Sequence, residues 1–337
     1  MLNDIENLIN SRPLSSSDTQ RLFDFFLSNS AEKQELESAL ESYLLSTADL
    51  LPSASEIVGA ALSLRSQMMV VPVARSLAAI DTCGTGGSGH RTFNTSTAAA
   101  FVCVGAGLKV AKHGNRAVSS KTGSADVLEK LGVPINLSSE QVATRVVRDG
   151  FGFMFAPLFH PATKQAAVIR KKLGVRTIFN FLGPLVNPAK VVRQVVGVSS
   201  IQMMPVLAQS LAELGVERAL VVRGQDGLDE ITLTENSDVF EIENGRIISY
   251  SVCPEDFMLS KVSMDLISVD SVEQSAQKIL EVLNGVPGPL FDLTVLNAGA
   301  AIYVSGKEPS IAAGIEEARR SILSGMALAA LKKAQAE

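Results

Sequence analysis

The sequence predicts an α/β protein in which a small helical N-terminal domain precedes a larger domain built on a mostly parallel central sheet. Up to about Met69, apolar residues recur at helical spacing and no alternating strand pattern occurs. From about Val70, short apolar runs alternate with helical stretches of ten or more residues, which is typical of a parallel sheet covered on both faces. The chain has 337 residues, 46% of them hydrophobic, and this length favours about two domains.

The N-terminal region is predicted to hold three helices, over residues 19–28, 31–45 and 53–66. Ser15 to Asp18 offers N-cap residues for the first of them. Ser53 and Glu56 have the spacing of a capping box at the start of the third. No residue of this region indicates chemistry, so we predict a packing role for it.

The larger domain is predicted to alternate strands with helices. The strands are expected over residues 77–80, 108–111, 133–137, 151–155, 193–199 and 218–223. The helices are expected over residues 97–105, 122–131, 139–149, 162–173, 176–182, 271–283 and 310–334. Residues 238–250 alternate around Asn244-Gly245, which indicates a hairpin with a type I′ turn.

The composition excludes several classes of protein. The net charge of −5 argues against nucleic-acid binding as the main function. The N-terminus does not resemble a signal peptide, and no apolar run reaches the ~18 residues that span a bilayer, so we expect a cytoplasmic protein without a membrane partner. Cys83, Cys103 and Cys253 are expected to be reduced thiols. Cys83 is either a nucleophile or, as we favour, a small buried residue.

A glycine-rich loop between Asp81 and Thr97 is the most informative stretch. Four glycines lie within six positions, at Gly84, Gly86, Gly87 and Gly89. Glycine permits positive φ, so backbone N–H groups can turn toward a bound anion, and the following helix adds N-cap residues and its positive end. The stretch therefore predicts a phosphate-binding loop. It fits neither the Walker nor the dinucleotide pattern, and a tight turn without a ligand is the alternative.

A second polar turn, Lys112 to Ser120, follows the next expected strand. It combines two cations, an amide, two hydroxyls and a glycine. Because loops at the carboxyl ends of neighbouring parallel strands meet at one sheet edge, we expect the two turns to form one continuous site.

Together the two turns resemble the anthranilate phosphoribosyltransferases of tryptophan biosynthesis. Arg176 to Leu185 and Gly227 to Glu230 also match that family. The resemblance runs from about Ile80 to Ile231 and weakens toward both ends. It implies a nucleoside phosphorylase/phosphoribosyltransferase-like fold in which residues 161–185 pack back onto residues 1–70. Residues 71–160 and 186–337 would then form the α/β domain.

The resemblance implies that the donor, 5-phosphoribosyl 1-pyrophosphate (PRPP), is bound by the first two motifs. Several phosphates need converging N–H groups, cations and a metal, which these motifs supply. The implied residues are Gly84, Gly87, Ser88, Thr92, Asn94, Thr95, Ser96, Thr97, Lys112, His113, Gly114, Asn115, Arg116, Ala117, Val118, Ser119, Ser120 and Ser124.

Asp229 and Glu230 are adjacent carboxylates in an expected loop, which predicts a Mg²⁺ site, because Mg²⁺ binds through carboxylates, waters and substrate phosphates. The alternative is a solvated surface pair. The resemblance implies that Asp229 and Glu230 bind Mg²⁺ and that Ser96 binds a second Mg²⁺.

The resemblance also implies an anthranilate site. Its residues would be Gly84, Asn115, Arg170, His113, His160 and Pro184. Arg170 would meet the carboxylate, since a guanidinium can bind it through two hydrogen bonds. Alternatively, Arg170 belongs to a solvated helix face and the histidines are structural.

The expected reaction is attack of the anthranilate amine on the anomeric carbon of PRPP, with diphosphate as leaving group. The aryl amine is neutral near pH 7, so we assign no residue as acid or base and expect catalysis by positioning and charge stabilisation. The resemblance also implies a homodimer. Two alternatives stay open, a pyrimidine-nucleoside phosphorylase and a nucleic-acid-binding relative without enzymatic activity.

One position departs from the family pattern. The loop usually reads Gly-Thr-Gly-Gly-Asp, whereas Ser88 stands at its last position here. This removes a negative charge beside the expected metal, and we hypothesise that Ser88 weakens or shifts the Mg²⁺ dependence.

Overall fold

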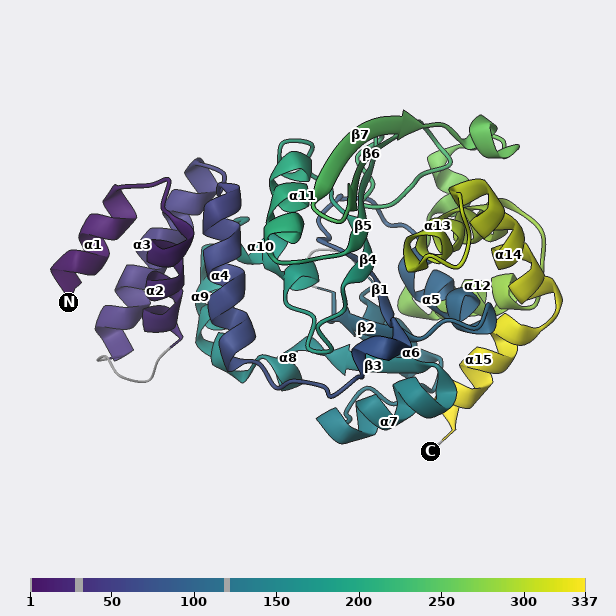
Figure 1. The fold of residues 1–337 in the computed structure, drawn as a ribbon, viewed down its shortest axis with the longest axis horizontal. Helices are drawn as coiled ribbons and strands as arrows, with labels where there is room; N and C mark the ends of the chain where they lie inside the picture. The colour runs from purple at the N-terminus through teal and green to yellow at the C-terminus, as the bar shows by residue number, and fades with distance from the viewer. Residues whose placement is uncertain (1, 28–32, 118–121, 337) are drawn as a thin grey trace.

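The computed structural model describes residues 2–27, 33–117 and 122–336. Figure 1 shows an elongated molecule, with the N-terminal helices at one end and a helix-covered sheet at the other. The N-terminal helices are α1 (Leu2–Asn10), α2 (Ser16–Phe26), α3 (Lys33–Asp49) and α4 (Ala54–Gln67). The predicted caps are confirmed, because Ser15 accepts from the Asp18 amide and Ser53 and Glu56 form the capping box of α4.

Within the described residues, seven strands form one sheet in the order β3-β2-β1-β4-β5-β6-β7. The strands are β1 (Ile80–Gly84), β2 (Val110–Gly114), β3 (Phe151–Phe155), β4 (Arg193–Gly197), β5 (Arg218–Gly224), β6 (Ser237–Glu243) and β7 (Arg246–Val252). β1 to β5 are parallel, and β6 and β7 are antiparallel. The predicted α/β class with a mostly parallel sheet is therefore confirmed.

Three strand predictions differ from the structure. β1 and β2 lie three and two residues later than expected, so Asp81 to Gly84 and Lys112 to Gly114 are strand residues rather than loop residues. Because several of these residues are polar, the hydropathy pattern did not reveal that they belong to buried strands. The predicted strand 133–137 is wrong, because this segment is irregular. Its apolar residues Val133 and Ile135 pack into the core without forming a strand.

The helices α5 (Thr95–Gly105), α6 (Ser124–Lys130), α7 (Ser139–Asp149), α11 (Met203–Glu213) and α12 (Val272–Leu283) accompany the sheet. The expected helix over 310–334 is two helices, α14 (Ile311–Leu323) and α15 (Met326–Gln335), separated at Gly325 with φ +78°. The sequence did not reveal α13 (Pro289–Ser305), because it is buried around most of its circumference and has no polar face. The predicted hairpin is confirmed, with Asn244 and Gly245 at φ 49° and 82°.

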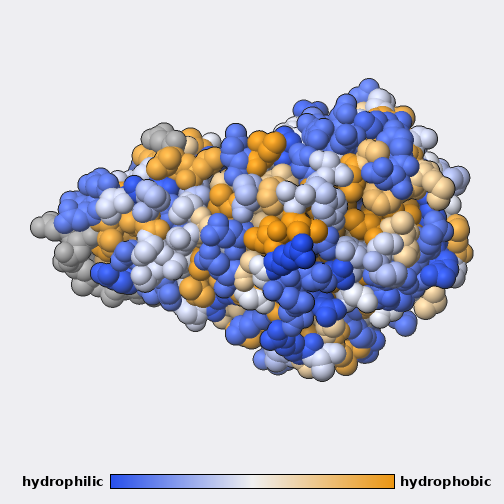
Figure 2. Space-filling model, turned by 45° about the horizontal axis from the view of Figure 1, so that its top comes forward, coloured by the Kyte–Doolittle hydropathy of each residue, from blue (hydrophilic) through white to orange (hydrophobic). Residues whose placement is uncertain are grey.

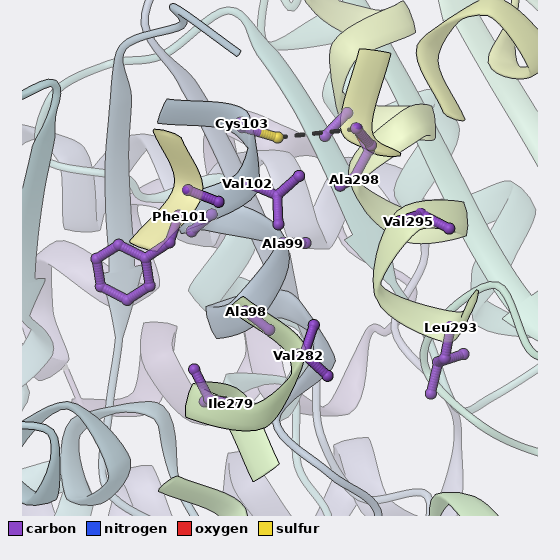
Figure 3. Packing of buried hydrophobic residues seen from close by; sticks show 14 of the residues in the cluster. Ala98, Ala99, Phe101, Val102, Cys103, Ile279, Val282, Leu293, Val295 and Ala298 are labelled. Atoms are coloured by element: carbon purple, nitrogen blue, oxygen red, sulfur yellow. Dashed lines mark hydrogen bonds between the residues drawn. The ribbon is translucent and has the colours of Figure 1, made fainter. Parts of the chain in front are cut away.

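One face of the sheet is covered by α5, α12, α13, α14 and α15, as Figure 1 shows. Small and aliphatic side chains allow close packing there. In Figure 3, Ala98 and Val102 of α5 lie among residues of α12 and α13, and the Cys103 thiol donates to the Ala298 carbonyl at 3.8 Å. This rigid layer fixes the N-terminus of α5 at the sheet edge.

The opposite face of the sheet carries α11 and, beyond it, the N-terminal helices (Figure 1). The helices α9 (Lys164–Leu173) and α10 (Phe179–Leu182) pack against those helices, whereas Phe159 of α8 (Ala156–Phe159) lies in a separate apolar cluster with Ala111 and Met154 of the sheet. Lys172 pairs with Glu41 at 2.9 Å, and the Ile178 amide donates to the Thr47 hydroxyl at 3.3 Å. The expected helix over 176–182 is only one turn long.

The surface is mixed, with hydrophilic residues over most of the face in Figure 2 and hydrophobic ones in separate patches. In the part of the chain that the structure describes, no helix is both long and apolar enough to cross a membrane.

Candidate functional site

The carboxyl ends of the parallel strands meet at one edge of the sheet, and four of them end in glycine, at Gly84, Gly114, Gly197 and Gly224. Loops from β1, β2 and β5 meet there. The two predicted phosphate-binding turns and the acidic pair therefore belong to a single edge, where ligands of open α/β sheets usually bind.

The acidic pair contacts the glycine loop directly. The Gly86 amide donates to Asp229 Oδ2 at 2.9 Å, and the Ser88 side chain acts against the rise that burial causes in the pKa of this carboxylate. A Cβ on Gly84 would lie 2.6 Å from Asp229 Oδ2, and a Cβ on Gly197 would overlap the Asp229 carbonyl. Glycine at these two strand ends is what allows the acidic loop to reach β1.

The turn of the glycine loop has the backbone that the sequence predicts. Gly86, Gly87 and Gly89 have φ of 70°, 83° and 81°. The Ser199 hydroxyl donates to the Gly86 carbonyl at 2.9 Å, and Arg176 donates to the Gly87 carbonyl. The loop is thus held from two other segments.

The loop leads into α5 through residues tied to their surroundings. Thr92 and Ser268 form an isolated antiparallel β-bridge. Asn94 is the N-cap residue of α5, but its side chain does not cap the helix and instead donates to the Thr122 hydroxyl at 2.9 Å. The buried Thr95 hydroxyl donates to the Phe93 carbonyl at 3.4 Å, and its side chain acts against the rise that burial causes in the pKa of Glu230. The first turn of α5 therefore links both other turns of the site.

Lys112 is buried in the sheet with its ammonium under the start of α5. Its Nζ donates to the Thr82 carbonyl and to Ser96 Oγ, the latter at 3.2 Å. Within the described residues, the buried Thr97 hydroxyl has no hydrogen-bond partner. Lys112 and Ser96 thus form one polar pair that joins the second turn to the start of α5.

The rest of the second turn is only partly described, since Val118, Ser119 and Ser120 lie outside the described residues. Gly114 ends β2, and the Ser124 hydroxyl donates to the Asn115 carbonyl at 3.4 Å. Ala117 donates its amide to Asp126 at 3.0 Å. Arg116 is exposed and pairs with Asp126 and Glu129 of α6, so its charge is turned toward α6.

His113 and His160 form a buried pair, with ring centroids 5.0 Å apart. His113 Nδ1 lies 3.2 Å from the Gly183 carbonyl, next to the buried Pro184. In the described structure, neither Nε2 has a hydrogen-bond partner. Burial, with repulsion from His160, lowers the pKa of His113 to about 3, and burial lowers the pKa of His160 to about 4. Both imidazoles are therefore neutral at pH 7.

Arg170 of α9 is half-buried, with its guanidinium carbon 5.3 Å from the centre of the Phe179 ring. Burial lowers its pKa. Its surroundings differ from those of the neighbouring Lys171 and Lys172, which are exposed. Arg170 is thus a partly desolvated cation rather than part of a solvated helix face.

The acidic pair is half-buried, and its electrostatics suit a cation. Burial raises the pKa of Asp229 and, with repulsion from Asp229 and Asp226, raises that of Glu230 to about 8. No three His, Cys, Asp or Glu side chains of the described residues converge on a metal position. The carboxylates of Asp229 and Glu230 and, separately, the Ser96 hydroxyl are hard oxygen donors of the kind that bind Mg²⁺ together with substrate phosphates and water.

Cys83 does not have the surroundings of a nucleophile. Its thiol contacts the Val195 carbonyl at 3.8 Å, and burial and the nearby Asp81 raise its pKa well above the usual value.

The sequence analysis assigned no role to Arg176, Asp81 or Asn187. Arg176 lies inside a recognised motif, and its charge was the available signal. No feature of the sequence indicated a role for Asp81 or Asn187. They come together only in the folded sheet, where Asn187 donates to Asp81 Oδ2 at 2.8 Å.

Comparison with known proteins gives consistent results. A family model described as "Glycosyl transferase family, a/b domain" matches residues 76–328. The anthranilate phosphoribosyltransferase of Clostridium kluyveri is 45% identical over 331 residues, covering 98% of this chain and 97% of that protein. The enzyme of the same name from Nitrosomonas eutropha is 49% identical over 275 residues, covering 82% and 81%.

Two solved structures are similar over almost the whole chain. An anthranilate phosphoribosyltransferase from Thermus thermophilus has a TM-score of 0.91 and 35% identity and covers 98% of both chains. One from Saccharomyces cerevisiae, in complex with PRPP and Mg, has a TM-score of 0.89 and 30% identity, covering 98% of this chain and 96% of that one. These names favour the first interpretation of the motifs over the phosphorylase and nucleic-acid-binding alternatives.

Proposed function

This chain belongs to the anthranilate phosphoribosyltransferases, glycosyltransferases of tryptophan biosynthesis, and we propose that the carboxyl edge of its sheet carries out their reaction. The reaction moves the 5-phosphoribosyl group of PRPP to the amine of anthranilate and releases diphosphate. The observation that carries the assignment is the contact of Asp229 with the glycine loop at Gly86.

The donor is assigned to the two polar turns and the start of α5. The amides of the glycine loop, the hydroxyls from Ser88 to Thr97 and the ammonium of Lys112 provide hydrogen bonds and positive charge for its phosphates. Arg116 is a weaker member of this set, since two carboxylates already pair with it. The assignment of Val118, Ser119, Ser120 and Ser124 rests on the family motif.

Asp229 and Glu230 are the residues that would hold Mg²⁺, with Ser96 as a hydroxyl ligand for a second ion. Ser96 Oγ already accepts from Lys112, and a hydroxyl oxygen retains a second lone pair for a metal. When bound, Mg²⁺ supplies neutralisation of the diphosphate charge. The relative that supports this proposal is the Saccharomyces cerevisiae enzyme in complex with PRPP and Mg.

Anthranilate is assigned to the boundary between the sheet and α9, where Arg170 would bind its carboxylate. His113, His160 and Pro184 would line the approach, with Gly84 and Asn115 beside the aromatic ring. A solved Saccharomyces cerevisiae relative contains 4-fluoroanthranilate, which supports an aromatic acid as ligand. The neutral imidazoles add no charge that would compete with Arg170 for the carboxylate.

The chemistry then needs little proton transfer before attack. The neutral amine forms the new C–N bond at the anomeric carbon as the C–O bond to diphosphate breaks, and the nitrogen then loses its extra proton to water or to the released diphosphate. Lys112 and the loop amides stabilise the charge that develops on the leaving oxygen, and the buried start of α5 limits water.

Three further proposals concern the whole molecule. Residues 1–70 with 161–185 form one domain and residues 71–160 with 186–337 the other, supported by the packing of α9 and α10 on α3 and α4. The enzyme is a homodimer, supported by exposed apolar side chains on these helices, Leu45, Leu62 and Val168. We also propose that it acts in the cytoplasm.

Anthranilate fluorescence tests the function directly. With PRPP and Mg²⁺, the protein should abolish the fluorescence of anthranilate, and EDTA should prevent this loss. Unchanged fluorescence under these conditions, or phosphorolysis of thymidine instead, would refute the proposal.

A further inference from the structure

We propose that Asp81, held by Asn187 in a gap between β1 and β2, is a positioning residue that directs the Lys112 ammonium toward Ser96. The proposal rests on the function above, in which Lys112 binds the donor.

The gap is visible in the strand register. β1 pairs with β4 along its whole length, from Ile80 to Gly84, and β2 pairs with β3 from Val110 to Gly114. Between β1 and β2, however, only Ile80 and Val110 are paired. The two central strands therefore separate as they approach the carboxyl edge where the ligands bind.

Hydrogen bonds of side chains replace the backbone hydrogen bonds that are missing between β1 and β2. The Asn187 amide donates to Asp81 Oδ2 at 2.8 Å and to the Ala111 carbonyl at 2.9 Å. The His113 amide lies 3.4 Å from both Asp81 oxygens, and Asn187 Oδ1 accepts from the Ala189 amide at 2.8 Å. Asp81 has no exposed surface. Every described neighbour that is hydrogen-bonded to it is a donor, as an ionised carboxylate requires.

The Lys112 ammonium lies in the same gap between β1 and β2. The Lys112 side chain is 1% exposed, and its ammonium crosses the gap to the Thr82 carbonyl and to Ser96. The attraction between Asp81 and Lys112 opposes the burial that disfavours both charges. Without the carboxylate, the ammonium would lose its opposite charge inside the sheet, and β1 and β2 would lose the acceptor that bridges them.

Asp81→Asn tests the proposal, because it keeps the size of the side chain but turns one acceptor into a donor facing Asn187 and the His113 amide. The matched control is Glu56→Gln, which removes another fully buried carboxylate, paired with Arg12 at 2.7 Å among the N-terminal helices. Both variants should unfold at lower temperature. Only Asp81→Asn should lower kcat/KM for PRPP, by about tenfold or more, with KM for anthranilate within about twofold of wild type.

A double-mutant cycle with Lys112→Met separates positioning from a general loss of structure. If Asp81 acts through Lys112, Asp81→Asn should cost little further kcat/KM for PRPP once Lys112 is replaced. If Asp81→Asn fails to fold, Asn187→Ala, which removes a neutral amide, carries the same test.

An Asp81→Asn enzyme that loses stability but keeps the wild-type kcat/KM for PRPP would overturn the proposal. A loss of equal size in the wild-type and Lys112→Met backgrounds would overturn it too. An inactive wild type would instead refute the proposed function, so the two failures are distinguishable.

Discussion

The Gly86 amide donates a hydrogen bond to the Asp229 carboxylate at 2.9 Å, although the two residues are 143 positions apart in the chain. This bond joins the loop after β1 to the loop after β5, so amides suited to phosphates and carboxylates suited to Mg²⁺ share one edge. The close approach depends on glycine at the ends of β1 and β4.

Gly197→Ala should therefore damage the site more than the fold. Its Cβ would overlap the Asp229 carbonyl, so the acidic loop must move, at a cost of about 1–3 kcal/mol in stability. We expect a higher Mg²⁺ concentration for half-maximal activity. The control is Gly59→Ala, whose Cβ would lie 2.2 Å from the Ser16 carbonyl oxygen between α2 and α4, and it should lower stability without changing the Mg²⁺ requirement.

Arg170→Met should weaken anthranilate binding specifically. Hydrogen bonds to charged groups contribute about 1.5–3 kcal/mol, so KM for anthranilate should rise roughly ten- to hundredfold, while KM for PRPP stays near wild type. Lys172→Met removes an exposed cation two residues away and should leave both constants unchanged. Equal effects of the two variants would remove Arg170 from the proposed site.

Ser88→Asp should restore a negative charge beside Asp229 and so change the Mg²⁺ titration of activity. The Ser88 side chain is close enough to Asp229 to affect its pKa, and a carboxylate there would repel Asp229 unless a cation is bound. We expect a stronger Mg²⁺ dependence than in wild type. A titration curve that overlays the wild-type curve would end the hypothesis.

The buried histidines should make stability fall in acid. Burial lowers the pKa of His113 to about 3 and that of His160 to about 4, whereas an unfolded histidine titrates near 6.5. Between these values the unfolded chain binds more protons, so stability is lost as pH falls through about 6.5. At pH 5 the loss is about 2 kcal/mol for each histidine.

Urea unfolding of His160→Gln at pH 7.5 and pH 5.0 checks this sign. The decrease in unfolding free energy between the two pH values should be about 2 kcal/mol smaller than in wild type. An unchanged decrease would show that His160 is not held neutral by the fold.

The sequence predicted the parts of the molecule in which pattern and environment agree. The hairpin around Asn244-Gly245 and α7 fall where expected, because the turn has a strong backbone preference and the helix has a clear polar face. Prediction from the sequence failed where polar residues are buried, as in β1 and β2, and where a helix has no polar face, as in α13.

The residues of the site likewise fall into those that the sequence could predict and those that it could not. The glycine loop and acidic pair could be found from residue type and order. Arg176, which holds Gly87, and the Asp81–Asn187 pair could not be assigned, because their roles depend on which strands and loops become neighbours.

The most direct test of the central claim is a crystal structure of this protein with PRPP and Mg²⁺. We predict the donor's phosphates against the glycine loop and Lys112, with the metal on Asp229 and Glu230. Phosphates bound elsewhere, with these two carboxylates free of metal, would contradict the account.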